Sequence, residues 1–239
     1  EAVSKSLAAK RPVGMVLSGG ADSSLLYAVA YELTGQKSPT YTVALESKLQ
    51  TKYNDPHFVR IFNQQYPSEN REIRVNKATV MENWDAYIQS IDQPIGDSAG
   101  FLTWLVAKEA KEEVKVLISG AGADELFAGY NRHRAFRHYL NHPTLLRQIA
   151  TFSDFPFPGY LKKLLQSISK NPEDTFIQMA AVEKIPETYL GFFRPWYPKS
   201  EFGFKNALDW DRTFYLVNDI LKIHDNACMA HGIEGRAPY

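Results

Sequence analysis

The first half of the chain alternates short β-rich runs with segments whose apolar residues recur at helical spacing. The β-rich runs are VGMVL (13–17), TYTVAL (40–45), REIRV (71–75) and VKVLIS (114–119). Helical patterns start near residue 23, cover DPHFVRIFNQQY (55–66) and recur between the last two runs. This alternation predicts an α/β fold, in which a parallel twisted sheet is covered by helices.

The pattern changes after Asp124. As far as Asp225, aromatic and apolar residues recur at helical spacing, for example in LFAGYNRHRAFRHYL (126–140) and WDRTFYLVNDILKI (210–223). We interpret these aromatic residues as core packing. The expected organisation is therefore an α/β core over residues 1–130 and a helical C-terminal extension over residues 131–239.

Composition limits the classes of partner. The 239 residues contain 27 Lys plus Arg and 27 Asp plus Glu, so no overall basic field attracts nucleic acid or an anionic membrane. Cys228 is the single cysteine, which excludes an intramolecular disulfide framework and fits a reducing compartment. No apolar run approaches the roughly 18 residues of a membrane span. We expect a cytoplasmic protein with neither nucleic acid nor membrane as partner.

The stretch VLSGGADSSLLY (16–27) joins the first predicted strand to a helix. A strand that ends at Leu17, a glycine pair and a helix that starts near Ser23 place unpaired backbone N–H groups at a helix N-terminus, where the helix dipole also favours an anion. Asp22 would repel a bound phosphate unless Mg²⁺ bridged the two. The alternative is that Asp22 is only an N-cap and the glycines only a tight turn.

A second stretch, VKVLISGAGADELFAGY (114–130), repeats this design. Ligands of open parallel sheets bind at the carboxyl ends of the strands, so Asp124 could meet Asp22 across one crevice and share a Mg²⁺ ion with it. In the alternative interpretation, Asp124 and Glu125 are only a charge pair that the helix dipole favours.

The motifs resemble those of a known superfamily. SGGADSS (18–24) matches the S-G-G-x-D-S signature of the PP-loop ATP pyrophosphatases, which split ATP into AMP and pyrophosphate. SGAGADELFAGY, DQPIGDSAGF and HDNACMAHGIEGRAPY resemble, respectively, the S-G-x-G-x-D-E-x-F-x-G-Y, D-x-P-x-x-x-S and D-R-x-S-M-A-x-x-L-E-x-R-x-P-F blocks of asparagine synthetases. The chain is thus similar to the synthetase half of the asparagine synthetase superfamily, which includes β-lactam-forming and lasso-peptide-cyclising relatives.

The resemblance implies a two-step reaction. A substrate carboxylate attacks the α-phosphorus of Mg-ATP to give an acyl-adenylate and pyrophosphate, and an amine, usually ammonia, then displaces AMP. The parent activity would convert aspartate to asparagine. The implied partners are a small-molecule carboxylate, ammonia and a glutaminase domain or subunit that supplies nitrogen. A second copy of the chain, forming a homodimer, is an alternative that the sequence leaves open. The resemblance also implies that the extension returns to the active site and that the chain is part of a longer protein.

Site residues follow from motif position under the same resemblance. Pyrophosphate and metal would be held by Ser18, Gly19, Gly20, Asp22 and Ser23, with Asp124 as the second metal ligand. Leu17, Val43 and Ala44 would lie by the adenine and Gly120 by the ribose. Glu125 and Arg236 would contact the substrate or order the site, which makes Asp22, Asp124, Glu125 and Arg236 the candidate catalytic residues.

The sequence departs from the family pattern at two positions. Ala121 stands where asparagine synthetases carry an acidic or amide residue and a β-lactam-forming relative carries tyrosine, and a methyl group cannot accept a proton from the amine. Asn226 replaces the usual arginine. The 239 residues include neither the glutaminase domain nor the lysine-bearing segment that family members carry outside this region. We therefore expect this chain by itself to use free ammonia or an amine and to turn over poorly.

Three rival interpretations remain. Ala121 favours a related amide synthetase that acts on another carboxylate, such as a peptide, a sugar acid or a secondary metabolite. A degenerate ATP-binding module is a second rival, against which Asp22 and Asp124 argue. A tRNA-thiolating enzyme would need reactive cysteines and a basic surface, whereas this chain has one cysteine and no net charge.

His133 and His138 lack the i, i+4 spacing of a zinc helix, so we expect no metal role for them.

Overall fold

A computed structural model describes residues 1–46, 54–152, 157–200 and 203–239. Two compact units can be distinguished, which we call the sheet unit (Glu1–Gly122 with Asn218–Tyr239) and the helical unit (Ala123–Val217). The sheet unit therefore includes the last 22 residues as well as the first 122. The domain division expected at residues 130 and 131 stays a prediction, and each unit is described by itself below.

The sheet unit is built on five parallel strands in the order β3-β2-β1-β4-β5. They are β1 (Val13–Val16), β2 (Pro39–Leu45), β3 (Glu69–Val75), β4 (Val116–Ile118) and β5 (Glu234–Arg236). The register pairs Met15 with Thr40 on one side of β1 and with Ile118 on the other. The predicted α/β class and parallel sheet are confirmed. β5 was not expected, because it has three residues, two of them charged and one a glycine.

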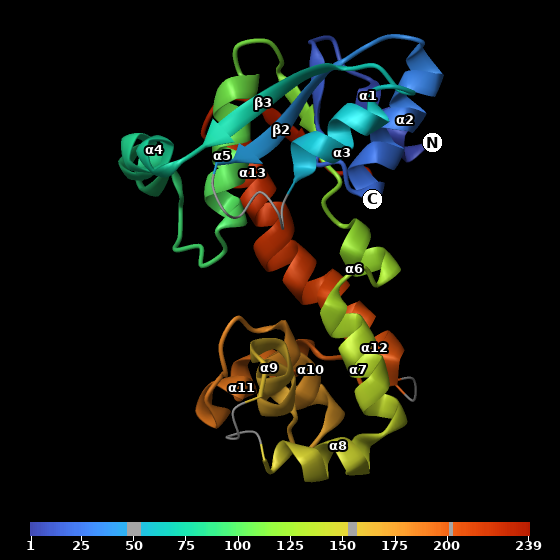
Figure 1. Ribbon diagram of the computed structural model, residues 1–239, viewed down its shortest axis with the longest axis vertical. Helices are drawn as coiled ribbons and strands as arrows, with labels where there is room; N and C mark the ends of the chain where they lie inside the picture. Colours follow the sequence, from blue (N-terminus) through green and yellow to red (C-terminus); the bar gives the residue numbers. More distant parts are fainter. Residues whose placement is uncertain (47–53, 153–156, 201–202) are drawn as a thin grey trace. The chain divides into compact units, whose positions relative to one another are not determined.

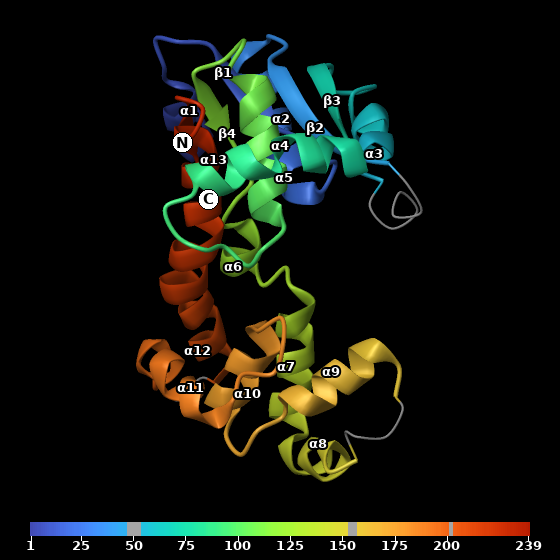
Figure 2. The same ribbon diagram turned by 90° about the vertical axis from the view of Figure 1, so that its left-hand side faces the viewer.

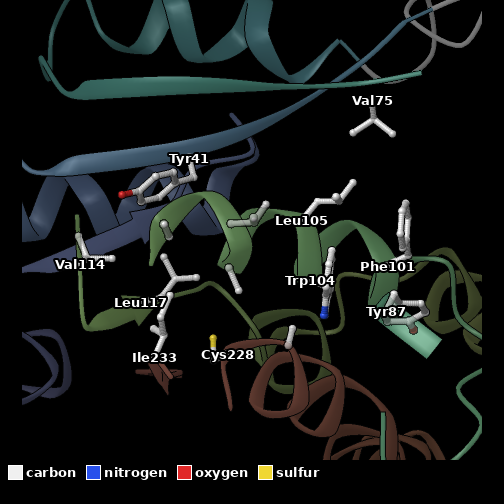
Figure 3. Close-up of a cluster of buried hydrophobic side chains, with 14 residues drawn as sticks. Tyr41, Val75, Tyr87, Phe101, Trp104, Leu105, Val114, Leu117, Cys228 and Ile233 are labelled. Carbon is white, nitrogen blue, oxygen red and sulfur yellow. The ribbon is translucent and has the colours of Figure 1, made fainter. Parts of the chain in front are cut away.

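Two layers of helices cover the sheet (Figures 1 and 2). One apolar cluster packs α1 (Ala2–Leu7), α2 (Ala21–Thr34) and α3 (Asp55–Phe62) on β1 and β4. The other, shown in Figure 3, packs α4 (Lys77–Ser90), α5 (Ala99–Ala110) and α13 (Leu221–Met229) on the opposite face, with Tyr41, Trp104 and Leu117 at its centre. Alternate β residues point to opposite faces, so Leu117 joins one cluster while Val116 and Ile118 join the other.

The described part of the helical unit consists of helices around an aromatic core. They are α6 (Ala123–Phe127), α7 (Asn131–Asn141), α8 (Pro143–Ala150), α9 (Gly159–Ser167), α10 (Pro172–Ala180), α11 (Glu187–Phe193), the 3₁₀ turn η2 (Arg194–Trp196), α12 (Gly203–Trp210) and the π-helix η3 (Asp211–Ile220), which runs past the end of the unit. Phe136, Phe176 and Trp210 lie in the core. The aromatic pattern of the sequence thus builds a core, as predicted.

None of the helices in the described parts of the chain is both long and apolar enough to cross a membrane.

Candidate functional site

The loop between β1 and α2 begins at Leu17, which is held firmly at the end of the strand. Leu17 is fully buried, its N–H donates to the carbonyl of Tyr41 at 2.9 Å, and its carbonyl accepts the hydroxyl of Thr42 at 2.7 Å. Gly19 follows with φ +73°, and a Cβ there would lie 2.7 Å from the Cβ of Phe58 on α3. Only glycine fits this position, so the loop presents backbone rather than side chains.

Two serines brace the loop from within. The backbone N–H of Ser18 donates to Oγ of Ser23 at 3.1 Å, and the two hydroxyls lie 3.0 Å apart. Gly20 occupies the N-cap position of α2, and no side chain among the described residues caps this helix. Asp22 lies inside the first turn, partly exposed. The interpretation of Asp22 as an N-cap is therefore wrong, and the first-turn amides of α2 are left for an external acceptor.

The loop after β4 packs on this first turn. A Cβ on Gly120 would lie 3.4 Å from the backbone N of Ser23 and 3.6 Å from Cβ of Asp22. β1 and β4 are neighbours in the sheet, and β1 is the strand from which β2 continues in one direction and β4 in the other. Ligands of open α/β sheets bind at such a switch point. Within the sheet unit, the structure therefore brings Gly120 together with Asp22 and Ser23.

Asp124 and Glu125 begin α6 in the helical unit. The chain turns sharply after α6, with Ala128 at φ +59°, and the N–H of Gly129 donates to the carbonyl of Asp124 at 3.0 Å. A Cβ on Gly129 would overlap Oδ1 of Asp124 and lie 2.8 Å from its Cγ. The Asp124 carboxylate thus lies directly against the α-carbon of Gly129, where a larger residue would displace it.

Glu125 is an interior residue. Only 1% of it is exposed, and its Oε1 accepts the hydroxyl of Tyr130 at 2.5 Å. Burial raises the pKa of Glu125 above its ordinary value, and the hydrogen bond from Tyr130 opposes that rise. Of the two roles considered for Glu125, this position supports ordering of the site.

Arg236 is held at the end of β5. Its Nη1 donates to the carbonyls of Ser6 at 2.7 Å and Ala8 at 3.1 Å, and its Nε donates to Glu234 at 2.8 Å. The backbone carbonyl of Arg236 accepts from the N–H of Ser119 at 3.0 Å. The guanidinium therefore joins α1 to the edge strand, and the backbone supports the loop after β4.

Val43 and Ala44 lie near the end of β2 and face different surroundings. Val43 packs on the cluster drawn in Figure 3, whereas Ala44 lines a hollow of about 300 Å³. That hollow is otherwise lined by Leu45, Glu46, Asn54, Pro56, Arg60, Glu72 and Arg74. Most of these lining side chains are charged or polar.

Two motif blocks meet at Asp92. The amide of Asn226 donates to Asp92 at 2.9 Å, and Nζ of Lys222 donates to it at 3.1 Å. The hydrogen bond from Lys222, followed by that from Asn226, lowers the pKa of this carboxyl. The asparagine that replaces the family's arginine therefore keeps a hydrogen bond between the two blocks.

Sequence analysis missed Tyr239. Its hydroxyl donates to the carbonyl of Asp22 at 3.0 Å, so the chain's last residue reaches the first turn of α2. The resembled block ends in phenylalanine, which cannot make this bond. The tyrosine at that position was the only signal in the sequence.

Two other residues of the third block lie in the interior. Cys228 is fully buried, and burial raises the pKa of its thiol to about 12, which leaves it unreactive at neutral pH. His231 packs on Trp104 with ring centroids 4.6 Å apart, and burial lowers its pKa to about 4. Neither side chain supplies the site with a nucleophile or a cation.

The donor set fits phosphate and Mg²⁺. The glycine loop forms a backbone cradle, the first-turn amides of α2 face outward from its end, and carboxylate oxygens are the ligands that Mg²⁺ prefers. No group of three His, Cys, Asp or Glu side chains suited to a metal occurs among the described residues.

Comparisons with known proteins agree with this geometry. The sequence model of a family described as asparagine synthase matches residues 1–239. Asparagine synthetase [glutamine-hydrolyzing] 1 of Bacillus subtilis is 28% identical over 95% of this chain and 38% of its own length. A Methanocaldococcus jannaschii protein, provisionally named a glutamine-hydrolyzing asparagine synthetase, is 34% identical over 51% of this chain and 23% of its own length. A similarly named protein of Mycobacterium tuberculosis is 27% identical over 100% of this chain and 39% of its own length. The chain thus spans at most about two fifths of these relatives.

Proposed function

Because the chain belongs to the asparagine synthase family, we propose that it catalyses ATP-dependent formation of an amide bond. One observation carries the proposal: the glycine loop after β1 and the glycine loop after β4 meet at the switch point of the sheet, with Gly120 against Asp22 and Ser23. That arrangement suits the phosphates of a nucleotide. Magnesium and the acyl-adenylate belong to the proposal.

Each part of the site has a role in this proposal. The backbone of residues 18–20, the Ser23 hydroxyl and the first turn of α2 bind the pyrophosphate end of ATP. Gly120 lies by the ribose, and the hollow beside Ala44 receives the adenine. Asp22 and Asp124 would hold Mg²⁺, which supplies charge neutralisation and polarises the α-phosphate.

Two bond exchanges complete the reaction. A carboxylate oxygen of the substrate forms a bond to the α-phosphorus while the bond to the bridging oxygen of pyrophosphate breaks. The amine nitrogen then bonds to the acyl carbon, the bond to AMP breaks, and the nitrogen loses a proton to solvent or to a nearby base. The loop amides offset the charge that develops on the leaving pyrophosphate.

Aspartate with ammonia, or with nitrogen derived from glutamine, is the parent substrate pair. Ala121 favours a second candidate, a related synthetase for another carboxylate. In the loop after β4, the N–H of Ala121 donates to the Ser119 hydroxyl at 3.4 Å, and its methyl group offers no proton acceptor. If aspartate is the substrate, the proton must leave by another residue or by water.

The test is release of AMP and pyrophosphate from Mg-ATP. We expect release only with a carboxylate present, aspartate being tested first and a panel of peptide, sugar-acid and amino-acid carboxylates next. Asp22→Asn should abolish release, whereas Asp85→Asn, which changes an exposed carboxylate on α4, should leave it unchanged.

The outcomes separate the candidates. Release with aspartate supports asparagine synthesis, and release with another carboxylate supports the second candidate. ATP binding without any release across the panel supports the degenerate module. Formation of ADP and phosphate instead of AMP would refute the proposed chemistry.

A further inference from the structure

The helical unit contains a chain of contacts that ends on the acidic pair Asp124 and Glu125. It begins at Asp211, which is fully buried 79 positions after Arg132 and pairs with it across the unit. Nη2 and Nε of Arg132 approach one oxygen of Asp211 at 3.0 and 3.3 Å, and Nε2 of His133 approaches the same oxygen at 2.5 Å. Only 11% of the Arg132 side chain is exposed. The guanidinium is therefore fixed at one end by a buried carboxylate.

The guanidinium of Arg132 also contacts two aromatic rings. Its central carbon is 3.9 Å from the ring centroid of Tyr130 and 4.3 Å from that of Tyr215. The two rings are themselves 6.0 Å apart in an edge-to-face arrangement, so the cation lies in the corner that they form. A weakly hydrated cation suits such a position, because it interacts with both rings while its N–H groups bind the carboxylate.

Tyr130 connects Arg132 to α6. Its ring contacts Arg132, and its hydroxyl donates to Oε1 of the buried Glu125 at 2.5 Å. Glu125 is the neighbour of Asp124, whose carboxylate rests on Gly129 in the same turn. The path from Asp211 to Glu125 thus passes through Arg132 and Tyr130.

We propose that Arg132, held by Asp211 and in contact with the rings of Tyr130 and Tyr215, is a positioning residue that fixes the α6 turn and with it the direction of the Asp124 carboxylate. The inference rests on the proposed function for its purpose, since Asp124 is there a metal ligand. Arg132 itself touches neither nucleotide nor metal in this proposal.

The variant that tests it is Arg132→Lys. Lysine keeps the positive charge beside Asp211 but lacks the extended guanidinium that contacts both rings and the second nitrogen that binds the carboxylate. Arg137→Lys, on the exposed side of the same helix, is the matched control. Tyr130→Phe keeps the ring on Arg132 and removes only the hydroxyl that reaches Glu125.

The first readout needs no activity: hydrogen exchange of the amides of residues 123–130, at matched global stability. We expect Arg132→Lys and Tyr130→Phe each to speed this exchange by about five- to tenfold, the effect of losing roughly one hydrogen bond of ordinary strength. Arg137→Lys should leave it unchanged. Because both changes act on one path, the double variant should exchange no faster than either single variant.

The second readout separates positioning from general destabilisation. The Mg²⁺ concentration for half-maximal binding to the complex with a non-hydrolysable ATP analogue should rise several-fold in Arg132→Lys, while binding of the analogue without Mg²⁺ stays unchanged. A smaller folded fraction would lower the amount of metal bound but not its midpoint.

Unchanged exchange over residues 123–130 in Arg132→Lys, or single effects that multiply in the double variant, would overturn the inference. If Arg132→Lys fails to fold, Tyr215→Leu replaces it in the test, because this change removes one of the two ring contacts of Arg132 and no charge. Tyr215→Phe, which keeps the ring, is its control. A wild-type chain that neither binds ATP nor releases pyrophosphate refutes the proposed function, and the exchange result still decides the role of Arg132.

Discussion

Gly19→Ala should destabilise the sheet unit and remove phosphate binding together. Gly19 has φ +73°, a conformation that costs a residue with a Cβ about 1 kcal/mol or more. A glycine to alanine change also stiffens the unfolded chain, which offsets part of this cost.

Space adds a larger penalty at Gly19. A Cβ would lie 2.7 Å from the Cβ of Phe58 and 3.1 Å from the carbonyl of Asp55 and the N of Val59, so α3 would have to shift as a whole. Forcing one carbon into a filled space costs about 1–3 kcal/mol. The expected loss in the free energy of unfolding is therefore about 2–4 kcal/mol.

Gly35 and Gly20 are matched controls in the same unit. Gly35 ends α2 at φ +64°, and a Cβ there would meet no described atom within 4 Å, so Gly35→Ala carries the conformational cost alone, about 1 kcal/mol. Gly20 has φ −70°, and the nearest neighbour of a Cβ would be the Ser18 hydroxyl at 3.3 Å, so Gly20→Ala should cost little. Urea denaturation gives the three free energies, and titration with Mg-ATP gives the affinities.

The order Gly19, Gly35, Gly20 in decreasing loss of stability is the prediction. If Gly19→Ala is no more destabilising than Gly35→Ala, α3 does not enclose the loop as described. If Gly19→Ala binds Mg-ATP as well as the wild type does, the loop is not the phosphate site.

Three further changes test other parts of the structure. Burial lowers the pKa of His231 to about 4, so between about pH 6.5 and 4 only the unfolded state takes up a proton at this residue. The free energy of unfolding should therefore fall as the pH falls through this window. His231→Phe should flatten the plot of urea midpoint against pH, and an unchanged slope would contradict the assignment. Tyr239→Phe removes the hydrogen bond to the Asp22 carbonyl and should lower the free energy of unfolding by about 0.5–1.5 kcal/mol in urea titrations; no loss would mean that the bond contributes nothing. Gly129→Ala should displace the Asp124 carboxylate and raise the Mg²⁺ midpoint for AMP release, and an unaltered midpoint would show that Asp124 does not bind the metal.

The sequence was sufficient to predict the elements in which local pattern and tertiary structure agree. β1, β2 and β4 are rich in apolar or β-branched residues, and each precedes a turn or a helix, so their period and their neighbours indicate the same structure. β3 (ENREIRV) is mostly charged or polar, and Ile73 and Val75 near its end carry its β signal. The loop after β1 was predictable because two adjacent glycines after a buried strand are costly to order unless the backbone there must turn tightly or approach a ligand closely. β5 has no such pattern, since its position depends on pairing with β4.

The contacts that hold Asp124 and Glu125 could not be predicted from the sequence, for a physical reason. Arg132 and Asp211 are separated by 79 positions, and nothing local marks either as the partner of the other. Arg236 stays a predicted site residue by motif position. Its side chain binds the carbonyls of Ser6 and Ala8, more than two hundred positions earlier in the chain, and no local pattern marks these partners. Side-chain direction at a strand end depends on which helix covers that edge, and the sequence does not encode this locally.

The position of β5 has a consequence for how the sheet unit folds. β5 is the edge strand beside β4, yet Val116 and its partner Glu234 are separated by more than one hundred positions, with the whole helical unit encoded between them. Pairing of such distant residues is slow, because a long loop must close before any contact is gained. During synthesis, β1 to β4 are complete long before β5 leaves the ribosome, so until then β4 is an unprotected sheet edge. The length of the helical unit thus sets the delay between the synthesis of β4 and that of β5. A longer or slower-folding insertion at this point would prolong the exposure of β4 and favour aggregation of the nascent chain.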